Sequence, residues 1–220
     1  MRALIDLVLP LECGGCRTPG TRWCRQCGEA VSGEPVGVHT RLDPGVPVWS
    51  LGPHDGPRRR AVIAAKEHGR RDLARPLGVA LAGAVDMLRH WGELDPPQLA
   101  PLVLVPAPTR AGAARRRGGD PVTAMARAAA AALRPEPVTV APLLRLGAGV
   151  RDSVGMSAAR RRRNLAGRVR LCGGLRPSRA STVVLVDDVV TTGATACESL
   201  SALAAAGVRV HAVLTVTFAE

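Results

Sequence analysis

The chain has 220 residues, of which 46% are hydrophobic and 22% charged, a composition typical of a globular protein rather than of a disordered chain. Its formal net charge is +12, and Lys66 is the one lysine among 30 basic residues. Such a charge favours phosphate-bearing partners. The three tryptophans and one phenylalanine are too few for the base stacking by which many single-strand binders hold nucleic acids.

The first eleven residues are mostly apolar and are interrupted by Asp6. The run is too short to span a membrane, and Glu12 stands where a signal peptide has a small residue before its cleavage point. We therefore expect a short amphipathic helix, no membrane insertion and a cytoplasmic location, in which thiols stay reduced.

Two CxxC pairs follow, at residues 13–16 and 24–27, separated by seven residues. Four thiolates at this spacing are typical of a closed, tetrahedral Zn²⁺ site with a structural role. An iron–sulfur cluster or two disulfides could use the same residues, although a reducing cytoplasm disfavours the disulfides. Residues 1–32 are thus predicted to form a leading helix and a zinc element, with the metal ligands Cys13, Cys16, Cys24 and Cys27.

The rest of the chain divides into a Gly- and Pro-rich connector (33–57) and a larger domain (58–220) in which helices and strands alternate. Hydrophobic periodicity predicts helices at 61–67, 73–88, 122–133, 157–164 and 194–206. Short apolar runs predict strands at 46–51, 102–105, 137–144, 182–186 and 208–217. Strands that are apolar without alternation and that alternate with helices indicate an α/β fold with a parallel sheet.

The most informative segment is residues 182–195, in which an apolar strand leads to Asp187 and Asp188 and then to a turn with Gly193. The carboxyl end of a parallel strand is where open α/β sheets bind ligands. The N-terminus of the helix that follows attracts anions through its unpaired N–H groups and its dipole. The segment therefore suits a molecule with neighbouring hydroxyls and a phosphate, such as a ribose 5-phosphate.

This segment resembles the binding signature for phosphoribosyl pyrophosphate (PRPP) in type I phosphoribosyltransferases, which is a hydrophobic run, Asp-Asp and then Thr-Thr-Gly-x-Thr. The resemblance implies that Asp187 and Asp188 hold the ribose 2′ and 3′ hydroxyls, and makes both candidates for proton transfer. Residues 191–195 would cradle the 5-phosphate. The implied PRPP-binding set is Asp187, Asp188, Val189, Thr191, Thr192, Gly193, Ala194 and Thr195. The alternative interpretation is an ordinary strand–turn–helix with a capping threonine.

A second segment, residues 102–108, resembles the pyrophosphate loop of the same family and is followed by three successive arginines. Guanidinium groups suit a polyphosphate leaving group, although a solvated basic loop explains the same residues. The predicted phosphate contacts are Pro106, Ala107, Arg115, Arg116, Arg117 and Lys66.

Taken over nearly its whole length, the chain resembles the ComF family of bacterial competence and DNA-uptake proteins. The further matching features are the four cysteines, residues 66–69 (Lys-Glu-His-Gly) and the basic run 161–164. Residues 117–120 read Arg-Gly-Gly-Asp where the family has Arg-Gly-Phe-Asn, and the family's Gln is replaced near Ser153.

The resemblance implies a type I phosphoribosyltransferase-like domain that binds PRPP or a ribose phosphate, with Mg²⁺ if it is catalytic. It also implies a role in DNA uptake, with single-stranded DNA held by its backbone and a competence motor ATPase as further partners. The alternatives are an active phosphoribosyltransferase of nucleotide salvage or biosynthesis and a non-catalytic PRPP-responsive regulator.

Overall fold

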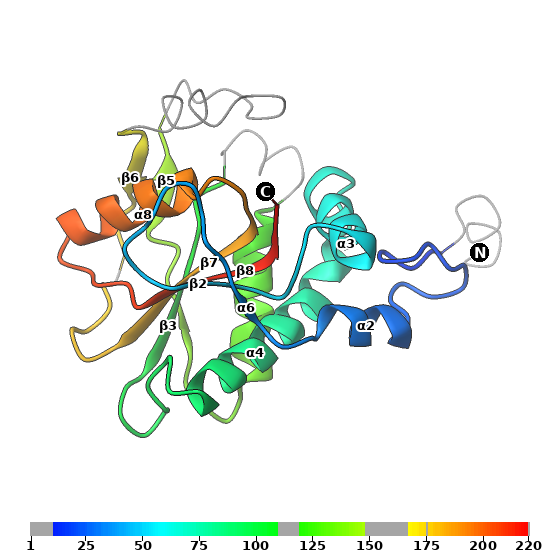
Figure 1. Ribbon diagram of the computed structural model, residues 1–220, viewed down its shortest axis with the longest axis horizontal. Coiled ribbons are helices and arrows are strands. Elements are labelled where there is room, and N and C mark those ends of the chain that lie inside the picture. The colour runs from blue at the N-terminus through cyan, green and yellow to red at the C-terminus, as the bar shows by residue number, and fades with distance from the viewer. Residues whose placement is uncertain (1–10, 110–118, 148–166, 175, 220) are drawn as a thin grey trace.

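The computed structural model describes residues 11–109, 119–147, 167–174 and 176–219 (Figure 1). The helices expected at the N-terminus and at 157–164, and the arginines of 115–117, lie outside these ranges.

A six-stranded sheet forms the centre of the fold, in the order β1-β2-β8-β7-β3-β4 (Figure 1). Its strands are β1 (Val36–Gly37), β2 (Val48–Ser50), β3 (Leu102–Pro106), β4 (Thr139–Val140), β7 (Thr182–Val190) and β8 (Ala212–Phe218). The short β1 runs antiparallel to β2, and all other neighbours are parallel. A separate antiparallel hairpin pairs β5 (Leu144–Leu146) with β6 (Val169–Leu171).

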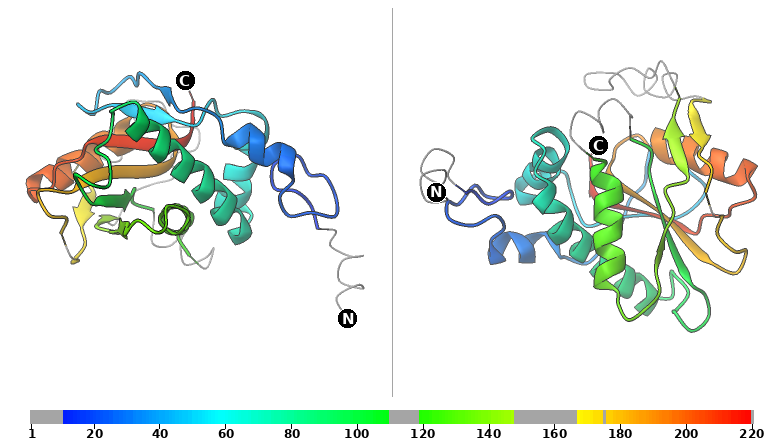
Figure 2. Two further views of the ribbon diagram at one scale, coloured as in Figure 1. Left: turned by 90° about the horizontal axis from the view of Figure 1, so that it is seen from below. Right: turned by 180° about the vertical axis from the view of Figure 1, so that it is seen from behind.

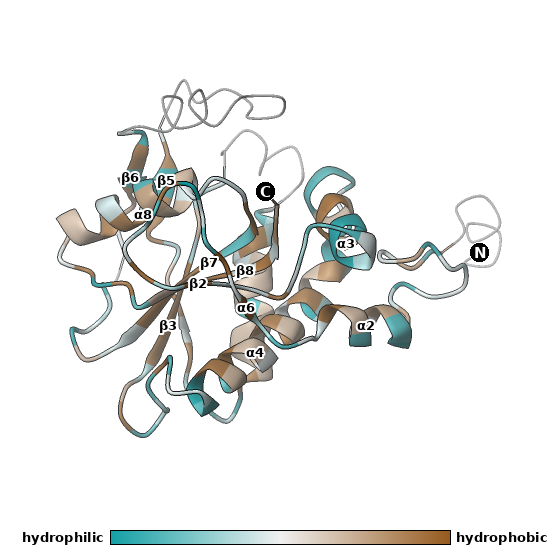
Figure 3. Cartoon of the chain, in the orientation of Figure 1, coloured by the Kyte–Doolittle hydropathy of each residue, from teal (hydrophilic) through white to brown (hydrophobic). Residues whose placement is uncertain are grey.

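Helices cover both faces of this sheet. Val184 and Val186 of β7 belong to one core with α3 (Gly56–Glu67), α4 (Ala74–His90) and α6 (Pro121–Ala132). The alternate residues Val183 and Leu185 belong to a second core with α8 (Ala194–Ala205) and the β5–β6 hairpin. Burial on both faces explains why the central strands are mostly apolar, as the brown parts of these strands in Figure 3 show.

Close packing on the first face depends on small residues. A Cβ on Gly78 of α4 would lie 2.5 Å from the Cβ of Ala128 in α6, and the two helices cross in contact in Figure 2.

The cysteine-rich segment continues into α2 (Arg25–Val31) and lies at the opposite end of the molecule from α8 (Figures 1 and 2). A 3₁₀ turn at Arg71–Leu73 precedes α4.

The predicted α/β fold with a mostly parallel sheet is confirmed. The expected boundary between strand and loop at Asp187 was wrong, because β7 continues to Val190 and pairs with β8 as far as Phe218. The connector supplies β1 and β2, and the strand at β6 was missed. Within the described ranges, every helix falls short of the length and apolar character needed to cross a lipid bilayer.

Candidate functional site

The carboxyl ends of β7 and β3 lie side by side and bring two of the predicted segments together. Pro106 pairs in register with Val186, and the Ala107 N–H donates to the Val186 carbonyl over 2.7 Å. Pro106 and Ala107 are both buried. The segment expected to contact pyrophosphate therefore runs beside the strand end that carries Asp187.

Asp188 is buried and ion-paired. Asp188 lies on the same face of β7 as Val184 and Val186, because every second residue of a strand points the same way. It therefore points toward the sheet face that α3 covers. There the Lys66 Nζ lies 3.1 Å from Oδ1 and 3.0 Å from Oδ2 of Asp188. The Asp188 side chain is 6% exposed, and its charge raises the pKa of Lys66. Lys66, predicted as a phosphate contact, thus neutralises the carboxylate next to the loop.

Asp187 is in a different state from its neighbour. Its Oδ1 accepts a 2.8 Å hydrogen bond from the Asp188 N–H. Burial, reinforced by the negative charge of Asp188, raises the pKa of Asp187 to about 8. At neutral pH Asp187 is therefore mostly protonated and lies beside the Asp188–Lys66 ion pair, so the site does not present the two free carboxylates that the sequence suggests.

The loop after β7 turns directly into α8. Gly193 is the N-cap residue, with φ of +82°, and it has no side chain to cap the helix. The N–H groups of the first turn of a helix have no partners within the helix, and the dipole makes this end positive. Thr191, Thr192 and Thr195 are half-buried around the turn. Residues 191–195 thus bring threonine hydroxyls to the N-terminus of α8, where the Ala194 N–H donates to the Thr192 Oγ1 over 3.4 Å.

A segment far away in sequence packs on this loop. The Leu42 N–H donates to the Thr192 carbonyl over 3.0 Å, and the Cys197 Sγ lies 3.7 Å from the Leu42 carbonyl oxygen. A Cβ on Gly193 would lie 2.5 Å from that same oxygen and 2.8 Å from the Thr40 Oγ1. Gly193 is therefore required by the chain's own packing as well as by any phosphate that approaches the loop.

Gly193→Ala is expected to destabilise the protein by about 2–4 kcal/mol, because it adds a clash with Leu42 to the strain of a positive φ. Gly207→Ala is the matched control, since Gly207 has φ of +75° and open space around its Cβ position; it should cost about 1 kcal/mol. Urea unfolding of both variants measures the difference. Equal losses would show that the Leu42 contact does not constrain Gly193.

His54 also belongs to this end of the sheet, although no motif in the sequence indicated it. Its Nδ1 lies 2.8 Å from the Thr217 Oγ1, which donates to the Asp188 carbonyl over 3.4 Å. Because that hydroxyl donates its hydrogen to Asp188, the His54 Nδ1 is the protonated nitrogen. Burial and the nearby Arg59 lower the pKa of His54, so the ring is neutral at pH 7.

The three arginines predicted to contact pyrophosphate, Arg115, Arg116 and Arg117, lie outside the described residues. The chain on either side of them is joined, since the Thr109 Oγ1 donates to the Asp120 Oδ1 over 2.7 Å. Asp120 also caps α6 by accepting from the N–H groups of Val122 and Thr123.

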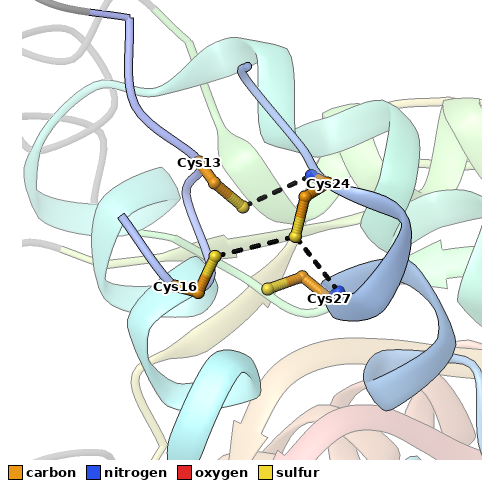
Figure 4. A group of neighbouring side chains, drawn as sticks. All are labelled: Cys13, Cys16, Cys24 and Cys27. Atoms are coloured by element: carbon orange, nitrogen blue, oxygen red, sulfur yellow. Dashed lines mark hydrogen bonds between the residues drawn. The ribbon is translucent and has the colours of Figure 1, made fainter. Parts of the chain in front are cut away.

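The four cysteines of the CxxC pairs form one cluster (Figure 4), with their sulfur atoms within 4.8 Å of one another. In a tetrahedral zinc site with Zn–S bonds of about 2.3 Å, the sulfurs lie about 3.8 Å apart. The Sγ atoms of Cys16 and Cys24 are 3.6 Å apart. The four residues therefore fit a metal such as zinc.

The surroundings of the sulfurs favour thiolates at some positions. The Cys13 Sγ accepts from the N–H groups of Gly15 and Cys24, both at 3.4 Å. Hydrogen bonds from Thr18 lower the pKa of Cys16 to about 6. Burial raises the pKa of Cys27; a cation placed among the sulfurs would reverse that effect, because a coordinating thiol is deprotonated. Backbone donors aimed at sulfur are what a thiolate ligand requires.

The cysteine cluster is attached to the main body by contacts that the sequence did not indicate. The Arg70 guanidinium donates to the carbonyls of Glu12 and Arg22, at 3.1 and 3.2 Å, and pairs with Asp72. Arg60 donates to the Gly15 carbonyl. A Cβ on Gly14 would lie 2.5 Å from Leu73, so the first CxxC turn packs directly on the start of α4.

Comparison of the chain with protein-family models and with curated proteins finds no match in either.

Proposed function

We propose that the chain is a ComF-like protein whose phosphoribosyltransferase-like domain binds PRPP or another ribose phosphate, and that it acts in DNA uptake in the cytoplasm. The observation that carries the proposal is the arrangement at one strand end. β7 delivers Asp187 and Asp188 to the carboxyl edge of a parallel sheet, and the loop beyond them ends at the N-terminus of α8. Ligands of open α/β sheets bind at this edge.

The two parts of the site would bind different groups of such a ligand. The backbone N–H groups and threonine hydroxyls of residues 191–195 would hold the 5-phosphate. Asp187 would hydrogen-bond a ribose hydroxyl, and Asp188 is held in place by Lys66. Ala107 and Pro106 would face the pyrophosphate, with Arg115, Arg116 and Arg117 as further contacts in the proposal.

Because both Asp188 oxygens contact the Lys66 Nζ, a magnesium ion that accompanies PRPP would be held by Asp187 in its ionised form, whose carboxylate oxygens are ligands of the kind that Mg²⁺ prefers. It would neutralise charge on the pyrophosphate oxygens. The four cysteines would hold Zn²⁺ and keep residues 11–32 folded against α3 and α4, where they could dock a competence motor ATPase. Single-stranded DNA would be held through its backbone.

Catalytic turnover is the second candidate function, and the raised pKa of Asp187 favours it. A group that titrates near pH 8 can exchange a proton during the reaction. A nitrogen nucleophile would form a bond to C1 of PRPP as the C1–O bond breaks. Pyrophosphate would leave with the bonding electrons, and Asp187 in its ionised form would take the proton of the nucleophile.

A pyrophosphate-release assay over a panel of purine, pyrimidine and pyridine bases separates the two functions. Catalysis predicts release with the wild type and a loss of about 10²-fold or more for Asp187→Asn, the usual contribution of a general base. Binding without turnover predicts no release from either protein.

For the role in DNA uptake, we expect deletion of the gene to reduce natural transformation; unchanged transformation would contradict that role.

A further inference from the structure

A basic hollow lies on the β5–β6 hairpin, and none of residues 187–195 lines it. Arg145, Arg168 and Arg170 line a hollow of about 300 Å³, together with Gly147. Arg145 and Arg170 are directly opposite each other in the strand register. The hairpin lies beside α8 in Figure 1.

The hairpin presents the arginines outward because its other face is anchored in the core. Leu144 and Val169 are buried in the second core, and Leu146 and Leu171 pack against it. Side chains alternate between the faces of a strand. Arg145 and Arg170 therefore share the opposite face, and both are exposed.

The strand register places two cationic side chains directly opposite each other. Like charges directly opposite each other in an antiparallel pair destabilise it. The nearby Glu198 accepts from the Gly167 N–H over 2.8 Å and does not line the hollow.

The chemistry of the hollow selects its ligand. The guanidinium groups of Arg145 and Arg170 offer planar pairs of donors that match phosphate oxygens. The residues that line the hollow include no aromatic side chain, so bases would not be stacked there.

We propose that this hollow is a binding site for a ligand with two or more neighbouring phosphates, which Arg145 and Arg170 would hold. The source is either a free polyphosphate or the phosphodiester backbone of a nucleic acid. The inference does not rest on the proposed function, because none of residues 187–195 lines the hollow.

The test titrates the full-length protein with inorganic tripolyphosphate by calorimetry and with a fluorescent dT 12-mer by anisotropy. Arg145→Gln with Arg170→Gln removes two of the arginines. The matched control is Arg134→Gln with Arg209→Gln, which makes the same change in charge at two exposed arginines. Thermal melts confirm that all the variants are folded, and Arg170→Gln alone serves if the double variant is not.

We expect the double variant to bind its ligand about 100-fold more weakly, since each charge-assisted hydrogen bond contributes about tenfold or more. The control should stay within about twofold of the wild type, because isolated surface charges act weakly. If the oligonucleotide is the ligand, the slope of log affinity against log salt should fall by about 0.7 for each arginine removed.

The two probes identify the source of the phosphates. Arginine-dependent binding of tripolyphosphate alone assigns a free polyphosphate, and arginine-dependent binding of the 12-mer assigns a nucleic-acid backbone. Three results overturn the proposal: neither probe binds, both double variants lose affinity equally, or Asp187→Asn weakens binding as much as the hairpin double variant does. The last result would place the anion at the end of β7 instead.

Discussion

Cys13→Ser combined with Cys24→Ser is expected to remove one metal equivalent per chain and to unfold residues 11–32. One ligand is lost from each CxxC pair, and the two remaining sulfurs cannot form a closed tetrahedral site. Metal binding of this kind contributes about 10–16 kcal/mol to the folding of small zinc domains at pH 7, far more than the hydrogen bonds of the segment can replace.

The structure predicts where the damage extends. Arg70 holds the carbonyls of Glu12 and Arg22, and Gly14 packs on Leu73. Because these contacts depend on the conformation of the cysteine turns, the start of α4 loses part of its cover. We therefore expect a lower melting temperature for the whole protein and rapid proteolysis within residues 11–32.

Elemental analysis of the purified protein, with melting curves and limited proteolysis, measures these effects. Cys172→Ser is the control, since Cys172 is remote from the cluster in sequence and is not among its four sulfurs. A double variant that retains a full equivalent of zinc would contradict the assignment of these ligands. An iron content with visible absorbance in the wild type would assign an iron–sulfur cluster instead.

Asp187→Asn is expected to stabilise the protein by about 2–5 kcal/mol at pH 9, while it weakens the proposed site. The pKa of Asp187 is raised from 3.8 to about 8 in the folded protein, so the folded state keeps a proton that the unfolded state releases. Stability therefore falls as the pH rises from about 4 to 8. Asparagine removes this dependence and can still accept the Asp188 N–H through its Oδ1.

Urea unfolding of the wild type and Asp187→Asn at intervals from pH 4 to pH 9 tests whether the stability of the wild type falls as the pH rises. The two stability curves should converge near pH 4 and separate as the pH rises, with the variant above the wild type. Lys66→Met is the opposing control, because it leaves the buried Asp188 without its cation and should destabilise the protein at pH 7. Parallel curves for the wild type and Asp187→Asn would mean that Asp187 is already ionised at low pH.

A variant that is more stable but binds less well is the signature of a functional residue held at a cost to stability. Burial and the negative charge of Asp188 both destabilise the ionised form of Asp187. A residue with no role beyond the fold would gain nothing from this arrangement. A more stable but weaker-binding variant would therefore indicate that Asp187 serves a ligand, which in our proposal is a ribose phosphate.

The sequence predicts the parts of this site that are local. Asp187, Asp188 and the turn at Gly193 are adjacent in the chain, and the two CxxC pairs lie within fifteen residues. Spacing alone therefore identifies them as groups. The parallel sheet also follows from the sequence, because strands buried on both faces have to be apolar throughout.

The remaining contacts depend on packing between distant segments. Lys66 pairs with Asp188, which lies 122 positions away in sequence. Leu42, in the connector, donates a hydrogen bond to the Thr192 carbonyl. His54 is isolated in sequence and reaches the site through Thr217. The extension of β7 to Val190 depends on the hydrogen bonds that β8 offers, so no local propensity could fix its end.

The hairpin arginines illustrate the same limit. Arg145 and Arg170 are 25 positions apart in the numbering, and only the register of β5 with β6 sets them opposite each other. The sequence instead indicated the arginines of 115–117 and the basic run 161–164.

Calorimetric titration of PRPP, with and without Mg²⁺, into the wild type and Asp187→Asn tests the central claim most directly. We predict one site per chain in the wild type and an affinity at least about tenfold weaker in the variant, whose melting temperature confirms that it is folded. No binding of PRPP to the wild type, or equal affinity in the two proteins, would contradict the assignment of the β7 strand end as a ribose phosphate site.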